Sequence, residues 1–349
     1  MKGKQIVGIA LIALIIVSLI YSGCTDDTKP KIVTPPTPAK VEISAPEFSS
    51  DSCFAQVKKQ TDFGPRVPNT KAHSACADWL TQKLQGFGAT VMNQSLQVKA
   101  YDGTLINGRN IIASFQPEKK NRVLLCAHWD TRPFADKDKD QLLWKKPIDG
   151  ANDGASGVGV LLEVARIINT QPTDIGIDII LFDAEDYGTP EFVAEDFKEV
   201  LNDQFVTSWC LGSQYWAKNP HVKNYNPRFG ILLDMVGATD AQFNREKFSN
   251  EVAPDVLGLV WSTAAKLGYS ALFTDQEVEG VIDDHVMLNR AGYRCIDIID
   301  TRPQVMAMGL GGYKFGQYHH THQDNISMID KNTLKAVGQT LLQVIYNQH

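Results

Sequence analysis

The stretch IGIDIILFDAED (residues 175–186) decides the fold, because it joins an unbroken apolar run to a cluster of acidic residues. Such a run is typical of a strand that is buried on both faces of a parallel sheet. Three other segments repeat the pattern of an apolar run that ends in polar residues: VLLCAHWD (123–130), RFGILLDMVG (228–237) and CIDIID (295–300). Together they predict a mostly parallel sheet whose strands end in polar side chains.

Segments with helical periodicity alternate with these strands. Apolar residues recur on one helical face between residues 158 and 168, between 256 and 267, and between 334 and 344. Strands that alternate with helices predict an α/β sandwich in one domain, with a mixed, mostly parallel central sheet flanked by helices. Ligands of open α/β sheets bind outside the carboxyl ends of the strands, so we expect a functional site there.

Composition agrees with a folded catalytic body. The chain has 349 residues, of which 43% are hydrophobic and 21% are charged, and this is enough to bury a large core. Its formal net charge is -6, and the body contains no block of Lys and Arg. The sequence therefore lacks the electrostatic pattern of a nucleic-acid-binding protein, and we expect no nucleic-acid partner.

The first 23 residues are typical of a signal peptide. Two lysines precede an apolar run at 6–20, which is shorter than the roughly 20 residues of a membrane-spanning helix. Small residues before Cys24 resemble the lipobox of bacterial lipoproteins. They predict a lipidated Cys24 that anchors the protein to a membrane of the bacterial cell envelope, facing the periplasm or the cell surface. Tyr21 stands where that motif usually has Leu, so an uncleaved anchor remains an alternative.

Residues 24–49 are expected to form a tether, because they are rich in Pro, Thr and charged residues. The catalytic domain is then expected to span residues 50–349. Five cysteines remain besides Cys24, and none belongs to a CxxC pair. An odd number predicts at least one thiol that is free or bonded to another molecule. These cysteines are Cys53, Cys76, Cys126, Cys210 and Cys295.

Titratable residues gather at the predicted strand ends. His128 ends the first of these strands, and Asp130 would orient its imidazole through a hydrogen bond. Asp153 stands in the Gly-rich loop DGANDGASG (149–157) before a helix, where capping of that helix is the simpler alternative. Asp234 follows the apolar segment GILL. A buried acid at that place needs a partner.

The acidic pair Glu185 and Asp186 is harder to explain as solvated loop residues. Adjacent strand residues face opposite ways, so both can serve one site only if the chain leaves the strand at Ala184. One carboxylate could then bind a metal while its neighbour moves protons. Asp283 and Asp284 precede a short helical stretch in VIDDHVML, and either could simply cap that helix.

The stretch HHTHQDN (319–325) puts three of the chain's eight histidines into four positions. A polar loop is one explanation. With four acids at strand ends elsewhere in the chain, a metal site is the better one, because imidazole and carboxylate are zinc ligands. The residues alone do not decide which histidine would reach the metal.

Taken in order, HWD, ANDGASG, FDAED, LLDMVG and HHTHQD resemble the zinc-dependent M28 peptidase superfamily over most of residues 50–349. That resemblance implies an α/β sandwich and makes Glu185 the acid/base. It makes His320 the ligand among the three histidines, with His319 and His322 flanking the site. The complete zinc-binding set that it implies is Asp153, Asp186 and His320.

Within this superfamily, CAHWDT, LLDMVGA and VIDDH look like the glutaminyl-peptide cyclotransferases, especially those of bacterial type. The resemblance implies cyclisation of N-terminal glutamine in peptides or proteins to pyroglutamate, with loss of ammonia and one Zn²⁺ per chain. It also implies a hydrogen-bonded carboxylate network of Asp234 and Asp283 beside the metal. Excess negative charge in a small site leads to the hypothesis that these two acids share a proton.

The chain departs from the animal members of this family at three positions. Those members have Glu, Trp and His where this chain has Asp186, His319 and Asp297. Without that tryptophan, the aromatic wall of the substrate pocket must come from another part of the chain. We expect it from Trp209 or Tyr187.

Two other functions compete with the cyclase. A two-zinc aminopeptidase is the chief alternative, because His128 and Asp234 stand where a second zinc would bind, with Asp153 as the bridge. The number of metal ions would discriminate, since a peptidase must generate a hydroxide whereas a cyclase has an internal nucleophile. A tethered binding protein on a degenerate peptidase scaffold is the last alternative.

Overall fold

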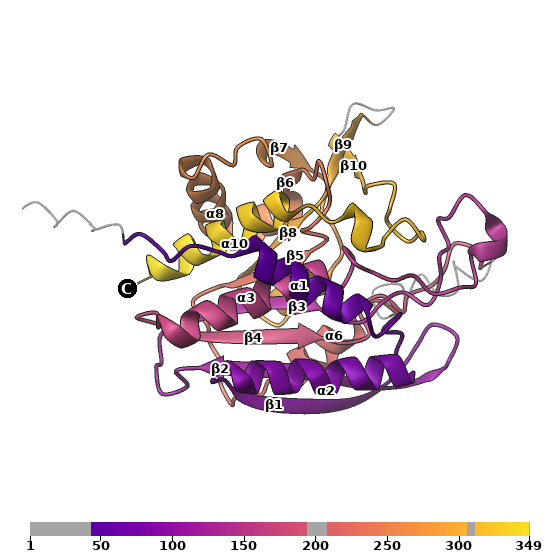
Figure 1. The fold of residues 1–349 in the computed structure, drawn as a ribbon, viewed down its shortest axis with the longest axis horizontal. Coiled ribbons are helices and arrows are strands. Elements are labelled where there is room, and N and C mark those ends of the chain that lie inside the picture. The colour runs from indigo at the N-terminus through magenta and orange to yellow at the C-terminus, as the bar shows by residue number, and fades with distance from the viewer. Residues whose placement is uncertain (1–42, 194–207, 306–310, 349) are drawn as a thin grey trace, which may run out of the picture. The chain divides into compact units, whose positions relative to one another are not determined.

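The computed structural model describes residues 43–193, 208–305 and 311–348. A six-stranded sheet lies at their centre (Figure 1). The strand order is β1-β2-β4-β3-β5-β8. The four strands predicted from sequence form the parallel part of the sheet. They are β3 (Arg122–His128), β4 (Gly176–Phe182), β5 (Gly230–Asp234) and β8 (Cys295–Ile299).

Two further strands extend the sheet beyond β4. β1 (Thr90–Lys99) pairs antiparallel with β2 (Leu105–Phe115), which pairs antiparallel with β4. Most residues of β1 are exposed or half-buried, whereas every residue of β4 is buried, as expected for an edge strand and a central strand. The sheet is therefore mixed and mostly parallel, as predicted.

Helices cover both faces of the sheet. Because successive strand residues face opposite ways, Leu125 and Ile179 pack in the large core cluster while Leu124 and Ile180 pack with Trp216 in a smaller one. The larger cluster is closed by α1 (Ser50–Thr61), α2 (Lys71–Gly86), α3 (Ser156–Thr170), α8 (Pro254–Lys266) and α10 (Lys331–Tyr346). The smaller one is covered by α6 (Leu211–Lys218) and α9 (Asp284–Arg290).

The remaining elements are short and were not predicted. β6 (Phe243–Glu246) pairs parallel with β7 (Phe273–Val278), and β9 (Arg302–Val305) pairs antiparallel with β10 (Gly311–Lys314). These pairs rise from the sheet edge where β8 ends (Figure 1). The short helices are α7 (Lys247–Val252) and the 3₁₀ turns Gln141–Leu143 and Ile326–Met328.

The folded body begins before the predicted boundary at residue 50. The Ile43 amide donates to Asn347 Oδ1 at 2.8 Å, and the Phe48 amide donates to Gln339 Oε1 at 2.9 Å. The Phe48 side chain is only 1% exposed. Residues 43–49 therefore lie along α10 instead of forming the end of a tether, because their amides and one aromatic ring find partners there.

The predicted signal peptide, Cys24 and the tether up to residue 42 lie outside the described residues. Within the described part of the chain, no helix combines the length and the apolar character that crossing a bilayer requires.

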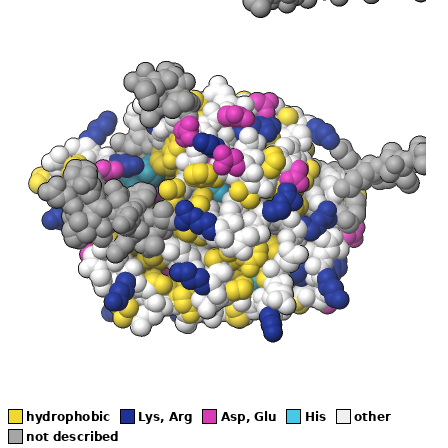
Figure 2. Space-filling model, turned by 180° about the vertical axis from the view of Figure 1, so that it is seen from behind, with side chains coloured by type: hydrophobic (Ala, Val, Ile, Leu, Met, Phe, Trp, Pro, Cys, Tyr) yellow, Lys and Arg dark blue, Asp and Glu magenta, His cyan; other side chains and the backbone are white. Residues whose placement is uncertain are grey.

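The five cysteines of the body are all buried with free thiols, which agrees with the prediction of at least one free thiol. Figure 2 shows the face opposite to that of Figure 1, where Lys and Arg side chains are scattered among hydrophobic ones.

Candidate active site and metal centre

A pocket of about 390 Å³ lies at the carboxyl edge of the parallel strands. Six of the residues predicted for the site line it: Asp153, Glu185, Asp186, Asp234, Asp283 and His320. Trp209, predicted as an aromatic wall, also lines it, and so does His319. The tertiary structure thus brings together side chains from six separate stretches of sequence.

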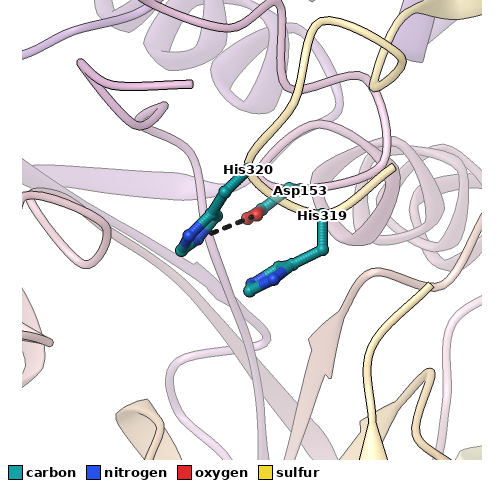
Figure 3. A group of neighbouring side chains, drawn as sticks. All are labelled: Asp153, His319 and His320. Carbon is teal, nitrogen blue, oxygen red and sulfur yellow. Dashed lines mark ion pairs between the residues drawn. The ribbon is translucent and has the colours of Figure 1, made fainter. Parts of the chain in front are cut away.

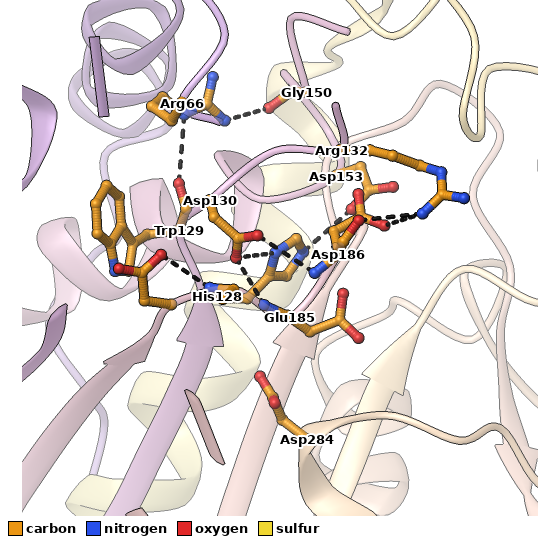
Figure 4. A network of polar contacts seen from close by, with 12 residues as sticks. Arg66, His128, Trp129, Asp130, Arg132, Gly150, Asp153, Glu185, Asp186 and Asp284 are labelled. Atoms are coloured by element: carbon orange, nitrogen blue, oxygen red, sulfur yellow. Dashed lines mark hydrogen bonds and ion pairs between the residues drawn. The ribbon is translucent and has the colours of Figure 1, made fainter. Parts of the chain in front are cut away.

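The acidic pair reaches the pocket through a turn in the backbone. β4 ends at Phe182 and Ala184 has a φ of 54°, a left-handed conformation that is uncommon for a residue other than Gly. The Asp130 carboxylate accepts hydrogen bonds from the amides of Glu185 at 3.1 Å and Asp186 at 3.2 Å (Figure 4). The chain therefore leaves the strand at Ala184 as predicted, and Asp130 holds the turn.

Hydrogen bonds to Asp324 hold the loop that carries Asp153. The Asp324 carboxylate accepts hydrogen bonds from the amides of Asn152 at 2.7 Å and Asp153 at 3.0 Å. Gly154 has a φ of 99°, and a Cβ there would lie 2.3 Å from the Asp130 carbonyl oxygen. The N-cap of α3 is Ala155, without a side-chain capping bond. Asp153 consequently does not cap the helix, and its carboxylate is free to face the pocket.

Arg66 also supports this loop, and its role was not predicted. Its fully buried guanidinium donates to the carbonyl oxygen of Asp149 at 2.5 Å. It also donates to the carbonyl oxygen of Gly150 at 2.7 Å (Figure 4). Asp324, equally unpredicted, belongs to the HHTHQDN stretch. Its acidic character was visible in the sequence, but nothing local indicated that it binds the Asp153 loop.

Three predicted zinc ligands converge in the pocket. His320 Nε2 lies 3.2 Å from Asp186 Oδ1 and 3.8 Å from Asp153 Oδ2. One ligand atom each from Asp153, His319 and His320 lies within 4.8 Å of the others, and Figure 3 shows the three side chains pointing toward one another. His319 therefore stands inside the cluster. His322 instead bonds Asp138 at 3.1 Å and does not line the pocket.

These residues fit a divalent cation. Both carboxylate oxygens of Asp186 are buried and have no hydrogen-bond partner among the described residues. Buried polar atoms without a partner are costly, so a proton or a cation must compensate them. Two carboxylates with an imidazole are a ligand set of Zn²⁺, and three protein ligands leave one coordination position for a substrate. Asp153, Asp186 and His320 would hold that ion.

Burial controls the charge states of these ligands. Burial, and next the charge of Asp153, raises the pKa of Asp186 well above its usual range. Burial, with the neighbouring His319, lowers the pKa of His320 well below its usual range. The imidazole is thus neutral, which is the form that binds metal, and the acids repel each other until a cation lies between them.

His128 is the centre of a second cluster. Its Nε2 lies 3.1 Å from Asp153 Oδ1, and its Nδ1 lies 3.5 Å from Asp130 Oδ1 (Figure 4). The same Nε2 lies 3.1 Å from Asp234 Oδ1. Burial lowers the pKa of His128, but the bonds with Asp130, Asp153 and Asp234 outweigh it and raise that pKa well above the usual value. A protonated ring at this place pairs with the acids, whereas a neutral ring could bind a cation together with Asp153 and Asp234.

Asp234 and Asp283 have different hydrogen-bond partners. Among the described residues, Asp234 Oδ1 bonds His128 Nε2, whereas Asp283 caps α9 by accepting from the Asp284 amide. Burial raises the pKa of Asp234 to about 7. The strand end at Asp234 directs that carboxylate to His128, and a proton shared by Asp234 and Asp283 stays a prediction.

Glu185 lies beside Asp283 and a buried thiol. Glu185 Oε1 accepts from Cys210 Sγ at 3.2 Å, and ligand atoms of Glu185, Cys210 and Asp283 all lie within 4.8 Å. Burial, then the charge of Asp283, raises the pKa of Glu185 well above its usual range. A carboxyl group with a raised pKa is a stronger proton acceptor than an ordinary glutamate, and this suits a group that takes up a proton and returns it. Cys210 was not predicted here, and no motif around it indicated this contact.

The aromatic wall differs in part from the prediction. Trp209 stacks on His320 with ring centroids 5.9 Å apart and planes at 5°, and Arg132 covers its ring at 4.7 Å. Tyr187 does not line the pocket, because it packs with Phe134 and a small apolar cluster away from it. The structure supplies Tyr313 and Phe315 instead, which sequence analysis missed because β9 and β10 were not predicted.

Comparison with known proteins agrees with this architecture. The sequence model of Peptidase family M28 matches residues 110–345. The chain is 53% identical to a Bacteroides thetaiotaomicron glutaminyl cyclase solved with N-acetylhistamine, covering 87% of this chain and 100% of that chain with a TM-score of 0.81. It is 52% identical to a leucine aminopeptidase precursor from the same organism, covering 88% of this chain and 100% of that chain with a TM-score of 0.81.

Curated relatives are more distant. The chain is 23% identical over 364 residues to the glutaminyl-peptide cyclotransferase of Bos taurus, which covers 93% of this chain and 90% of that protein. The matches to two other curated relatives span about half the length of each, 54% and 49%.

Proposed function

Because the chain belongs to Peptidase family M28, we propose that it uses this pocket to cyclise the N-terminal glutamine of peptides and proteins to pyroglutamate, with release of ammonia. The observation that carries the proposal is the placement of Glu185. Its half-buried carboxyl group lies beside Asp283 in the pocket and one residue before the predicted ligand Asp186. The likeness to a solved glutaminyl cyclase supports the same chemistry.

The reaction needs one proton carrier. The α-amine of the substrate attacks its own γ-carboxamide carbon, so that one C–N bond forms and the C–NH₂ bond breaks. Glu185 accepts the proton of the attacking amine and returns it to the departing ammonia. A Zn²⁺ held by Asp153, Asp186 and His320 would polarise the γ-carbonyl group. Trp209, stacked on His320, would bound the space in which the glutamine side chain bends back.

One metal ion suffices for this chemistry. The nucleophile belongs to the substrate, so no second metal is needed to generate a hydroxide. His128 supports a single ion, because its Nε2 already pairs with Asp153 and Asp234 at 3.1 Å. The aminopeptidase alternative would use the cluster of His128, Asp153 and Asp234, whose ligand atoms lie within 4.8 Å of one another. These three residues would hold a second ion once His128 lost its proton.

The test incubates the purified protein with a peptide that begins with glutamine and follows it by mass spectrometry. Cyclisation lowers the peptide mass by roughly 17 Da and releases one ammonia, because ring closure expels that molecule and adds no water. A peptide that begins with asparagine is the control and should not react. Free glutamine with a shortened peptide would establish the aminopeptidase instead.

We further propose that the enzyme is a lipoprotein of a bacterial cell envelope, anchored through Cys24. Support comes from the N-terminal sequence alone, where a short apolar run precedes small residues and this cysteine. Metabolic labelling with an alkyne-tagged fatty acid should mark the wild-type chain. The variant Cys24→Ala should remain unlabelled, and labelling of that variant would contradict the proposal.

A further inference from the structure

A second group of titratable side chains lies behind Asp283. His285 on α9, Asp297 on β8 and Glu246 at the end of β6 are each fully buried. His285 Nε2 lies 3.2 Å from Glu246 Oε1, and its Nδ1 lies 3.7 Å from Asp297 Oδ2. One imidazole thus stands between two buried carboxyl groups from different elements.

This group adjoins the pocket through Asp283. One ligand atom each from Asp283, His285 and Asp297 lies within 4.8 Å of the others. Asp283 itself lines the pocket and makes an equally close group with Glu185 and Cys210. Asp283 is therefore the shared member of two clusters, one that faces the substrate and one that faces the interior.

The inner cluster consists of Asp283, His285, Asp297 and Glu246, and several of its buried polar atoms have few hydrogen-bond partners. Among the described residues, both ring nitrogens of His285 are buried without a hydrogen bond of standard geometry, and the buried carboxyl groups of Asp283 and Asp297 lie within hydrogen-bond reach of each other. Buried groups without partners are costly. Small adjustments of these side chains would pair them, so the orientation of each depends on the charge and position of its neighbours.

Glu246 anchors the far end of the cluster. Its carboxylate accepts from the Phe248 amide at 2.9 Å, from the Ser249 amide, and from the Val281 amide at 3.2 Å. Val281 is part of the pocket wall. A side chain held by three backbone amides is rigid, and it gives His285 a fixed partner on the side away from the pocket.

We infer that His285 is a positioning residue for the cyclisation proposed above, held by Glu246 and acting with Asp297 to orient Asp283 beside Glu185. The inference rests on that proposed function. His285 does not line the pocket and would not touch the substrate. Its effect passes to the reacting atoms through Asp283, which it keeps in one orientation.

The charge states agree with such an arrangement. Burial raises the pKa of Glu246, but the close contact with the His285 imidazole and the bond from Ser249 outweigh it and the net pKa is lowered, so this group is ionised. Burial, then the charge of Asp283, raises the pKa of Asp297 well above its usual range. The cluster therefore holds its negative charge at the anchored Glu246 and a proton at Asp297, next to Asp283.

The test compares His285→Gln with the wild-type protein and with Asp283→Asn in a double-mutant cycle. We expect His285→Gln to lower kcat about tenfold or more while KM and zinc content stay unchanged, and to shift the pH profile of kcat. In the Asp283→Asn background, His285→Gln should lower kcat only a little further, because both substitutions act on the same side chain, that of residue 283. The matched control is His221→Gln, which removes a half-buried imidazole bonded to Trp216.

Three results would overturn the inference: wild-type kcat and pH profile in His285→Gln, an effect additive with that of Asp283→Asn, or a loss confined to zinc content. If His285→Gln fails to fold, Glu246→Gln replaces it, because this variant removes the charged partner of His285. It must likewise lower kcat and leave KM unchanged. A wild-type protein that forms no pyroglutamate would instead refute the proposed function itself.

Discussion

At the scale of single residues, the site depends on what burial does to charge. Glu185 and Asp186 are neighbours in the chain, yet the structure gives them different surroundings. Asp186 faces His320 at 3.2 Å and Arg132 at 3.5 Å, whereas Glu185 faces Cys210 and Asp283. One carboxylate is consequently suited to a cation and the other to carrying a proton.

Replacing Glu185 with Gln should remove catalysis and leave zinc binding intact. Gln keeps the size of the side chain but cannot accept the amine proton, so kcat should fall by a factor of about 100 or more. Ammonia release and zinc content per chain are the measurements. Glu191→Gln is the control, because that acid also lines the pocket. Near-native turnover in Glu185→Gln would show that another group carries the proton.

At the scale of elements, the site depends on turns that direct side chains from strand ends. The carboxyl ends of β3, β4 and β5 meet at one edge, and each turns into a loop that carries an acid or a histidine. Asp130 and Asp324 bind the backbone of two such loops. These acids act on the site through main-chain amides and not through the metal.

Replacing Asp130 with Ala should weaken zinc binding by a factor of about 10 to 100, although Asp130 is not among the expected ligands. The amides of Glu185 and Asp186 lose their acceptor, so the left-handed turn at Ala184 loses its support. Competition with a chromogenic chelator measures the affinity. Asp78→Ala, which removes a largely exposed carboxylate bonded to Arg109, is the control. Equal affinities would show that the turn holds itself.

A second prediction at this scale concerns the sheet away from the site. Asp178 on β4 pairs with Arg122 at 2.7 Å and accepts from Tyr225 Oη at 2.8 Å and Ser114 Oγ at 2.6 Å. Breaking a buried pair leaves a charge without a partner, so Asp178→Asn should lower the free energy of unfolding by about 3–5 kcal/mol. Urea unfolding at pH 7 measures it.

The pH dependence of this pair has a definite sign. Burial raises the pKa of Asp178, but the bonds from Arg122 and Ser114 outweigh it and the net pKa is lowered. The stability that the ionised form contributes is present above the unfolded pKa of about 4 and is lost as the pH falls through the folded pKa. The gap in unfolding free energy between wild type and Asp178→Asn should therefore shrink on acidification. A gap that widened would contradict this assignment.

At the scale of the whole molecule, a bound ion would join segments that are far apart in the chain. Asp153, Asp186 and His320 come from the loop before α3, the turn after β4 and the loop after β10. Each belongs to a segment packed on the same sheet edge. Metal binding to the folded state alone must therefore raise the stability of the whole body.

Removal of zinc should lower the Tm, and adding it back should restore the Tm at one equivalent per chain. Free zinc at 1,000 times Kd stabilises the folded state by about 4 kcal/mol. Scanning fluorimetry with elemental analysis measures both quantities, and Asp186→Ala should abolish the zinc-dependent change. Two equivalents would favour the aminopeptidase. A folded protein that purifies without zinc and takes up none would favour the non-catalytic binding scaffold.

The sequence by itself determined the central strands, three of the helices and the residues of the motifs. Apolar periodicity is a local property, so β3, β4, β5 and β8 and the helices α3, α8 and α10 could be found from it. The edge hairpin of β1 and β2 and the short pairs β6–β7 and β9–β10 were not found. Most residues of β1 are exposed or half-buried, and β9 and β10 have four residues each, so these strands leave little apolar pattern. β6 and β7 pair across the two helices that separate them in the chain, and such pairing is not a local property.

Only the tertiary structure decided which of the polar residues meet. In the structure, Asp234 bonds His128. Tyr187 lies outside the pocket, and Tyr313 and Phe315 line it. The structure also places Arg66 and Asp324 under the Asp153 loop, where no motif indicated them. The physical reason is that a carboxylate's partner is set by the position of strand ends and loops in space, which residue order and spacing do not encode.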